Sequence, residues 1–347
     1  MKSFTTIKIF FVVFFLIAQI TACNVKDKDK NINNQTVKKK NDILELERTI
    51  RLPGIKGRID HMAIDVKSQV LFITALGNNS VETVDLLKGE SFNSVKDIEE
   101  PQGILFIPEN NVLCVSSGGT GDCNFYDAKT FGFLSKVKLG TDADNLRFDP
   151  VKKLIYVGYG EGAIAIVDAE KYSIQSKIDL SGHPESFQLD KKNNKIYVNV
   201  PDSKLIEVAL LDNNSVNNKI SLKNAEANFP MDLDTVNDLI LIGCRKPAEL
   251  IVYDTKSSNE ITRFEIRKDA DDIFFDAKNK FIYISCGEGY LQVFKQEKKE
   301  VYNLSQEILT RKGARTSLYV PELNKMYLAV PRNDEEEAVI QIYSILS

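Results

Sequence analysis

Short runs of apolar residues recur along the chain at a nearly constant interval. There are seven of them: Leu71-Phe72-Ile73, Leu113-Cys114-Val115, Ile155-Tyr156-Val157, Ile196-Tyr197-Val198, Ile240-Leu241-Ile242, Ile282-Tyr283-Ile284 and Met326-Tyr327-Leu328. The central residues of successive runs lie 42, 42, 41, 44, 42 and 44 positions apart. A fixed period of this length indicates an internal structural repeat.

Each repeat carries the pattern of four short strands. A turn residue precedes the centre of every run by six or seven positions, namely Asp65, Pro108, Asp149, Asp190, Asp234, Asp276 and Pro321. A second apolar stretch follows the run, and in four repeats it ends in aspartate, at Asp85, Asp127, Asp168 and Asp254. A third stretch of alternating apolar and polar residues, such as 133–139, closes the repeat. Such units are typical of propeller blades, so we expect an all-β, seven-bladed β-propeller with four antiparallel strands per blade.

The two ends of the repeat array complement each other. The seventh repeat stops after its third strand, around 340–343, and the chain ends at Ser347. Residues 46–54 carry the fourth-strand pattern ahead of the first repeat. We therefore expect this N-terminal strand to pair into the last blade and close the ring, which hides sheet edges that would otherwise invite aggregation. On this hypothesis, deleting residues 43–54 opens blade seven.

The Ile-Tyr-Val runs, the aspartate-centred turns and the Val-Asp strand ends resemble the YVTN family of seven-bladed propellers, whose repeat is WD40-like. The resemblance extends from about residue 43 to the C-terminus, although glycine is scarcer in the turns than the family pattern prefers. It implies the fold and leaves the function open, because this architecture hosts binding modules, lactonases, lyases and redox subunits.

The N-terminus has the composition of an export signal. Lys2 and Lys8 precede an apolar segment at 9–20, which is too short to span a bilayer. The next residues, Ile20-Thr21-Ala22-Cys23, resemble the bacterial lipobox, which implies cleavage before Cys23 and acylation of its thiol. Ordinary secretion with an incidental Cys23 is the alternative hypothesis.

The residues after Cys23 are rich in lysine, asparagine and aspartate and contain almost nothing apolar, so they cannot bury enough surface to order. We expect a signal peptide over 1–22, a disordered lipid-anchored tether over 23–42 and a propeller over 43–347. Asn24 resembles the residue that directs lipoproteins to the outer membrane. The expected location is the cell envelope, at the outer membrane, on its periplasmic face or its surface.

Composition limits the classes of partner and cofactor. The formal net charge of −4 offers no electrostatic footprint for nucleic acid. The sequence lacks a Cys-x-x-Cys-His motif, so covalent c-type haem is not indicated. Membrane contact is expected through the lipid at Cys23, and the only candidate cofactor is a divalent cation at the channel mouth.

The candidate site follows from the geometry of a propeller, in which the first strand of each blade lines the central channel. Counting back twelve residues from each run centre gives one residue per blade: Asp60, Gln102, Asp144, Glu185, Phe229, Asp271 and Arg315. Neighbouring positions add His61, Asn145, His183, Asp272 and Thr316, with Arg58 and Arg147 close in sequence. The predicted ligand-binding residues are Asp60, His61, Gln102, Asp144, Asn145, His183, Glu185, Asp271, Asp272 and Arg315. The candidate metal ligands are the acids Asp60, Asp144, Glu185 and Asp271.

Three hypotheses for this ring remain open. Its polar residues could simply solvate a water-filled mouth, as charges at loop-to-strand joins commonly do. They could hold a hard cation or the cationic group of a ligand. They could also serve an enzyme, with His61 or His183 as general base and Asp271 or Asp144 as metal ligand or orienting carboxylate. Blades one and four lie nearly across the ring, so the two histidines would need a ligand between them.

Four cysteines remain besides Cys23. Cys114 and Cys123 flank a glycine-rich hairpin and are a candidate disulfide in an exported protein, with free thiols as the alternative. Cys244 and Cys286 hold equivalent positions in adjacent blades, too far apart for the roughly 5.5 Å Cα separation of a disulfide. We expect this second pair to be buried thiols.

Two function classes follow from the sequence. The first is a lipid-anchored scaffold that binds an envelope protein, a glycan or a small ligand. The second is a metal-assisted hydrolase or lyase, similar to lactonase propellers, that uses the ring at the channel mouth. The first is preferred because no catalytic motif stands out. The sequence does not indicate an oligomeric state.

Overall fold

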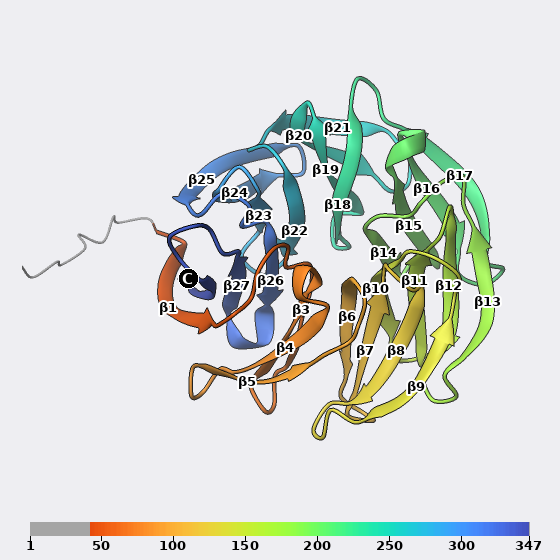
Figure 1. The fold of residues 1–347 in the computed structure, drawn as a ribbon. Coiled ribbons are helices and arrows are strands. Elements are labelled where there is room, and N and C mark those ends of the chain that lie inside the picture. The colour runs from red at the N-terminus through yellow and green to blue at the C-terminus, as the bar shows by residue number, and fades with distance from the viewer. Residues whose placement is uncertain (1–41, 347) are drawn as a thin grey trace, which may run out of the picture. The chain divides into compact units, whose positions relative to one another are not determined.

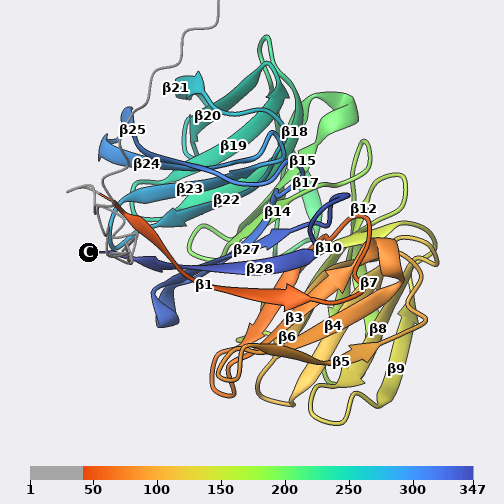
Figure 2. The same cartoon turned by 60° about the vertical axis from the view of Figure 1, so that its left-hand side comes forward.

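The computed structural model describes residues 42–346, so the predicted signal peptide, Cys23 and nearly all of the tether lie outside the described residues. The described part forms 28 strands and three single-turn 3-10 helices. The strands make seven separate four-stranded antiparallel sheets, which are arranged in a ring (Figures 1 and 2). The prediction of a seven-bladed β-propeller is confirmed. No helix within residues 42–346 is both long and apolar enough to cross a membrane.

The blades follow one another along the chain, and each runs from an inner to an outer strand. Blade 1 comprises β2 (Met62–Asp65), β3 (Val70–Ala75), β4 (Ser80–Asp85) and β5 (Glu90–Val95). Blade 2 comprises β6 (Pro101–Ile107), β7 (Val112–Ser117), β8 (Asp122–Asp127) and β9 (Phe133–Lys138). Blade 3 comprises β10 (Ala143–Asp149), β11 (Leu154–Tyr159), β12 (Ala163–Asp168) and β13 (Ser173–Asp179). Blade 4 comprises β14 (Phe187–Asp190), β15 (Lys195–Val200), β16 (Leu205–Leu210) and β17 (Ser215–Ser221). Blade 5 comprises β18 (Glu226–Asp234), β19 (Leu239–Lys246), β20 (Ala248–Asp254) and β21 (Glu260–Glu265). Blade 6 comprises β22 (Ala270–Asp276), β23 (Phe281–Cys286), β24 (Tyr290–Lys298) and β25 (Val301–Leu309). Blade 7 comprises β26 (Thr316–Val320), β27 (Lys325–Val330), β28 (Ala338–Ile345) and β1 (Leu44–Leu52), and the 3-10 turns are η1 (Leu76–Asn78), η2 (Pro201–Ser203) and η3 (Pro321–Leu323).

The apolar runs of the sequence are the second strands of the blades, such as β11 with Ile155, Tyr156 and Val157. These strands are apolar without alternation because both of their faces are buried against neighbouring blades. The fourth strands, such as β13, alternate or are largely exposed. The aspartates between strands act as turn residues, and Asp149 Oδ1 accepts hydrogen bonds from the main-chain N–H groups of Val151 and Lys152.

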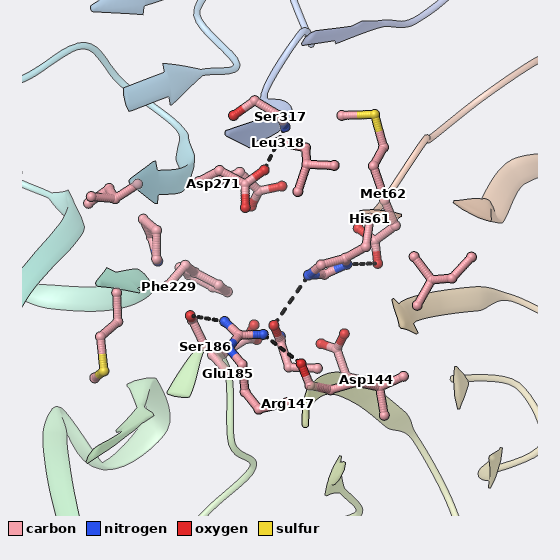
Figure 3. Close-up of a pocket in the computed structure, with 18 of the residues that line it drawn as sticks. His61, Met62, Asp144, Arg147, Glu185, Ser186, Phe229, Asp271, Ser317 and Leu318 are labelled. Atoms are coloured by element: carbon pink, nitrogen blue, oxygen red, sulfur yellow. Dashed lines mark hydrogen bonds and ion pairs between the residues drawn. The ribbon is translucent and has the colours of Figure 1, made fainter. Parts of the chain in front are cut away.

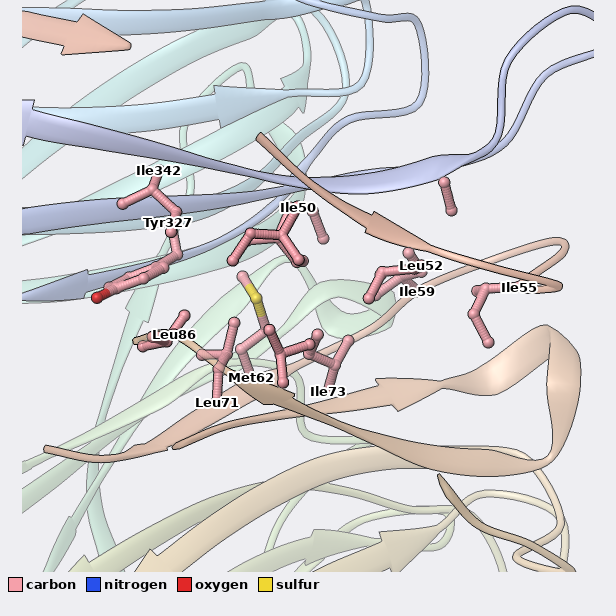
Figure 4. Close-up of a cluster of buried hydrophobic side chains, with 14 of the residues drawn as sticks. Ile50, Leu52, Ile55, Ile59, Met62, Leu71, Ile73, Leu86, Tyr327 and Ile342 are labelled. Atoms are coloured by element: carbon pink, nitrogen blue, oxygen red, sulfur yellow. The ribbon is translucent and has the colours of Figure 1, made fainter. Parts of the chain in front are cut away.

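The hydrophobic core is divided among the interfaces between adjacent blades. Seven clusters of buried side chains separate the seven sheets, one at each interface. The cluster between blades 7 and 1 contains Ile50 and Leu52 of β1, Tyr327 of β27 and Leu71 of β3 (Figure 4). Each blade therefore stabilises its two neighbours through the packing of its faces.

The N-terminal strand closes the ring as predicted. β1 pairs antiparallel with β28, with Leu44 opposite Ile345 and Leu52 opposite Ala338. The strand spans Leu44–Leu52, two residues earlier than the 46–54 expected from its pattern. β1 also contributes Leu44 to the cluster between blades 6 and 7. It thus packs into the interfaces on both sides of blade 7.

The four described cysteines are buried thiols. This is the expected state for Cys244 and Cys286. The Sγ atoms of Cys114 and Cys123 lie 3.0 Å apart, although the two residues are diagonal rather than opposed, because Cys123 pairs with Ser116. The hypothesis of a disulfide between them stays a prediction.

Candidate functional site

The predicted ring lies where the inner strands of the blades are interrupted. Four ring residues fall at register shifts between the first and second strands, and these are Gln102, Asp144, Phe229 and Asp271. The other three lie one or two residues before the first strand of their blade, and these are Asp60, Glu185 and Arg315. Bulges and strand ends change the direction of side chains. The ring residues therefore do not follow the alternating side-chain orientation of a regular strand.

The second strands hold the main chain of the ring in place. In four blades, the residue two positions after the centre of the apolar run donates a hydrogen bond from its side chain. The acceptor is the main-chain carbonyl of the channel-ring residue in the next blade. The pairs are Thr74 to Gln102 (2.7 Å), Ser116 to Asp144 (2.5 Å), Asn199 to Phe229 (3.0 Å) and Ser285 to Arg315 (2.5 Å). Each bond crosses a blade interface, so the positions of the ring residues depend on how adjacent blades pack.

Two adjoining cavities occupy the channel. The mouth cavity has a volume of about 400 Å³ and is lined by the predicted residues Gln102, Asp144, His183, Glu185, Asp271 and Arg315. The inner cavity has a volume of about 260 Å³ and is lined by Asp60, His61, Asp144, Asn145, Glu185, Asp271 and Asp272. All ten residues predicted as ligand-binding therefore line the channel. Their role in binding stays a prediction.

The two histidines do not share a cavity. His183 lines only the mouth, where its Nδ1 lies 2.6 Å from the carbonyl oxygen of Gly160 and 3.7 Å from Asp142 Oδ2. His61 lines only the inner cavity. Direct cooperation between them is thus excluded by position, as the spacing of blades one and four suggested.

Asp271 is neutralised by two arginines. Arg245 pairs with Asp271 Oδ1, and Arg315 Nε lies 3.2 Å from Asp271 Oδ2. Asp269 joins both arginines, at 3.4 Å from Arg245 Nε and 2.9 Å from Arg315 Nη1. The guanidinium of Arg245 also stacks on the ring of Phe229, 3.9 Å from its centroid. On this side of the mouth, the two carboxylates and the two guanidinium groups therefore pair with one another.

The Asp271 network weakens the hypothesis of a hydrolase or lyase. Neither histidine contacts Asp271, and both of its carboxylate oxygens face guanidinium groups. Counting along the first strands could not reveal Arg245, because it lies near the end of a second strand, β19. The enzyme hypothesis is not favoured by this arrangement.

The opposite side of the channel brings His61 into a cluster from two blades. His61 Nε2 lies 3.2 Å from Asn145 Oδ1, and His61 Nδ1 lies 3.5 Å from Asp60 Oδ2. His61 belongs to blade 1 and Asn145 to blade 3. The equivalent position of blade 2 is Gly103, where a Cβ would lie 2.3 Å from the carbonyl oxygen of Asp144. Figure 3 shows the carboxylate of Asp144 directed towards the His61 ring.

The ionisable groups of the inner cavity have strongly shifted pKa values. Burial alone would lower the pKa of His61, but the adjacent Asp60 carboxylate, with Asp144 and Asp272 beyond it, raises this pKa to about 10. Burial and the neighbouring Asp60 and Glu185 raise the pKa of Asp144 to about 8. Burial, Asp271 and Asp60 raise the pKa of Glu185 to about 7. Asp60 is paired with Arg58 and His61, whereas Asp144 and Glu185 have no ion-pair partner among the described residues.

Two half-buried groups of opposite charge, Glu185 and Arg147, line the inner cavity without an ion pair among the described residues. Glu185 makes no side-chain hydrogen bond or ion pair within residues 42–346. Arg147 donates only to neutral acceptors, the carbonyl of Leu146 at 2.8 Å and Ser186 Oγ at 3.3 Å. Burial lowers the pKa of Arg147, although Asp232, Asp272 and Asp144 offset part of the effect. Apolar side chains share the wall with these polar groups, among them Met62, Leu318 and Phe229 (Figure 3).

No family model and no curated protein matches the chain. Among solved structures, a chain of the crystal structure of the mitotic checkpoint complex has a TM-score of 0.76, with 12% identity over 96% of this chain and 99% of that chain. A chain of hydrazine synthase from Kuenenia stuttgartiensis has a TM-score of 0.71, with 15% identity over 80% of this chain and 96% of that chain. At these identities the likeness shows the propeller fold alone, and it does not bear on membership of the YVTN family.

Proposed function

We propose that this chain is a lipid-anchored binding propeller of the bacterial cell envelope, related to the YVTN type, whose channel holds a small ligand with both a cationic and an anionic group. The propeller supplies a rigid scaffold, and Cys23 supplies the anchor. The observation that carries the choice of ligand is the pair of unpartnered charges, Glu185 and Arg147, on the wall of one cavity.

A zwitterionic ligand compensates both of these charges at once. An ionised carboxylate or guanidinium in a buried site is costly unless it is paired and hydrogen-bonded. An ammonium group beside Glu185 would supply the ion-pair partner that this carboxylate lacks among the described residues. A carboxylate beside Arg147 would add charge-assisted hydrogen bonds to a guanidinium that now donates only to a carbonyl and a hydroxyl. The cavity of about 260 Å³ suits a molecule of the size of an amino acid.

The ligand proposal is tested by calorimetric titration of the full chain in detergent with the free amino acids. Each amino acid is compared with two analogues, one lacking the carboxylate and one lacking the amine. We expect at least one amino acid to bind more tightly than both of its analogues. Glu185→Gln should weaken binding of the amine analogue, and Arg147→Met should weaken binding of the carboxylate analogue.

A matched control is Asp212→Asn, which removes an exposed carboxylate from the hairpin between β16 and β17. This variant should bind as the wild-type chain does. Circular dichroism of each variant checks the fold, because Arg147 also lies 5.4 Å from the centroid of the Phe187 ring. If no amino acid binds, or if the zwitterion has no advantage over its analogues, the proposed ligand class is wrong.

The anchor is tested separately by metabolic labelling with an alkyne fatty acid. We expect the label and membrane association to be lost together in Cys23→Ser. The other four cysteines are buried in the propeller and serve as internal controls, since none should carry the label. A labelled Cys23→Ser chain, or an unlabelled wild-type chain, would contradict lipid anchoring while leaving the ligand proposal standing.

A further inference from the structure

Three potential metal-ligating side chains meet on the wall of the inner cavity. Asp60, His61 and Asp144 each place one ligand atom so that all three atoms lie within 4.8 Å of one another. Asp60 and His61 precede β2 in blade 1, and Asp144 lies on β10 in blade 3. The cluster is enclosed, since Asp60 is 3% and Asp144 is 6% exposed.

Each residue of this cluster has one buried polar atom without a hydrogen-bond partner among the described residues. They are Asp60 Oδ2, His61 Nδ1 and Asp144 Oδ1, one from each member of the trio. Buried polar atoms are normally satisfied, so an unsatisfied group in a native fold calls for an unseen water or ion. One such atom on each residue of a group whose ligand atoms lie within 4.8 Å of one another fits the donor set of a cation site.

The remaining atoms of the cluster are already held by neighbours. Asp60 Oδ1 lies 2.5 Å from Arg58 Nη2, which fixes the carboxylate and turns its other oxygen inwards. The contact from His61 Nε2 to Asn145 Oδ1 places the imidazole hydrogen on Nε2, because the amide oxygen is an acceptor. A cation at this point would displace the Nδ1 proton that the nearby carboxylates hold on the imidazolium, and it would bind the Nδ1 lone pair. Outer hydrogen bonds of this kind orient metal-binding side chains.

We propose that Asp60, His61 and Asp144 bind a single Zn²⁺ ion in the inner cavity. One imidazole nitrogen and two carboxylate oxygens suit Zn²⁺, whereas Ca²⁺ and Mg²⁺ prefer oxygen ligands alone. Three protein ligands leave a coordination position open towards the cavity. Ligands of tetrahedral Zn²⁺ with bonds of about 2.1 Å lie about 3.4 Å apart, which the His61 Nδ1–Asp60 Oδ2 distance of 3.5 Å already matches. No ligand atom of the trio is more than 4.8 Å from another, so only small side-chain shifts are needed. This inference does not depend on the proposed zwitterionic ligand.

The trio keeps two of the four acids expected from the sequence as metal ligands and adds a histidine. Asp271 is engaged by Arg245 and Arg315 and is not available to a cation. Glu185 lines the cavity, but it is not part of the group whose ligand atoms converge. His61, which the sequence suggested as a base, contributes a ligand nitrogen instead.

The test is calorimetric titration of the metal-stripped full chain with zinc chloride, using a purification tag that contains no histidine. We expect one Zn²⁺ per chain for the wild type. His61→Gln should weaken binding by more than about 100-fold, since loss of an outer hydrogen bond to a ligand alone costs about 10- to 100-fold. Asp60→Asn and Asp144→Asn each remove a carboxylate ligand, and each should abolish zinc binding at the site. His183→Gln and the exposed Asp212→Asn are the matched controls and should keep the wild-type affinity.

Asn145→Ala tests the positioning role of the outer amide. We expect it to weaken zinc binding by about 10- to 100-fold without changing the stoichiometry. A merely structural role for Asn145 would lower the thermal stability of the chain and leave zinc affinity unchanged.

A readout without mutations is the ¹⁵N chemical shift of the imidazole nitrogens, because His61 and His183 are the only histidines of the chain. Zinc should shift Nδ1 of His61 and leave both nitrogens of His183 unchanged. No stoichiometric binding by the wild type would overturn the proposal. So would equal losses in His61→Gln and His183→Gln, or an unchanged His61 spectrum at saturating zinc.

Discussion

The hydroxyl of Ser116 donates a 2.5 Å hydrogen bond to the main-chain carbonyl of Asp144, across the interface between blades 2 and 3. The same hydroxyl oxygen accepts a hydrogen bond of 2.8 Å from the N–H of Gly103. One small side chain therefore satisfies main-chain groups on both sides of the interface, at the place where the inner strands are bulged. The position of Asp144 in the channel depends on it.

Replacing Ser116 by alanine should destabilise the fold. The change leaves the carbonyl of Asp144 and the N–H of Gly103 unsatisfied in a buried interface, which costs about 1 to 3 kcal/mol. Urea denaturation measures the loss. Ser116→Thr is the matched control, because Thr74 performs the same role in blade 1. Equal stability of Ser116→Ala and the wild type would contradict this account of the ring.

Gln306 secures the strand that closes the ring. Its Oε1 accepts hydrogen bonds from the N–H groups of Ile43 (2.8 Å) and Leu44 (2.7 Å), and its Nε2 donates to the carbonyl of Leu44 (2.9 Å). Gln306→Ala should lower the free energy of unfolding by about 1 to 3 kcal/mol. It should also raise amide hydrogen exchange in β1 more than in the other strands of blade 7. Gln175→Ala, on the outer strand of blade 3, should change neither measurement.

Asp232 makes the stability depend on pH. Burial raises its pKa from 3.8 to about 6, even though the N–H of Phe275 donates to its carboxylate at 2.7 Å. The folded chain therefore keeps a proton on Asp232 that the unfolded chain releases near pH 4. This difference reduces the free energy of unfolding as pH rises from about 4 to about 6, and the contribution is constant above that range.

Asp232→Asn should remove this part of the pH dependence, because an amide oxygen accepts the same hydrogen bond and does not ionise. We expect the variant to match the wild type at pH 4 and to exceed it at pH 7 by on the order of 1 kcal/mol. Urea denaturation at both values measures the difference, with Asp212→Asn as the exposed control. A variant no more stable than the wild type at pH 7 would show that Asp232 carries no ionisation penalty.

Cys114 and Cys123 should form a disulfide during oxidative folding. Their Sγ atoms lie 3.0 Å apart, so little rearrangement is needed. Burial raises the pKa of Cys114 well above its usual value, which disfavours the reactive thiolate and should make oxidation of the folded chain slow. Alkylation of the unfolded chain followed by mass spectrometry should find this one disulfide after oxidative refolding. Cys244 and Cys286 should remain thiols, and four alkylated thiols in the propeller would contradict the prediction.

Local periodicity was enough to define the propeller. The runs with centres such as Tyr156 and Tyr197 mark second strands, and the turn aspartates mark hairpins, because both depend only on interactions within one blade. Equivalent strands must line the axis of a closed ring, so the count of twelve residues also located the channel wall. The pairing of an N-terminal strand into the last blade followed from the missing strand of the last repeat, whereas the exact bounds of β1 and its register with β28 did not.

The pairing of charges within the channel was decided by the tertiary structure alone. Asp271 and Asp144 occupy equivalent positions in the repeat, yet Asp271 is neutralised by Arg245 and Arg315, whereas Asp144 keeps a free buried oxygen beside His61. The repeat gives such residues the same position within their blades, but it does not determine which side chains from other blades surround them. Those neighbours come from other blades, 84 residues away for His61 and Asn145, and electrostatic interactions depend on distance in space rather than along the chain.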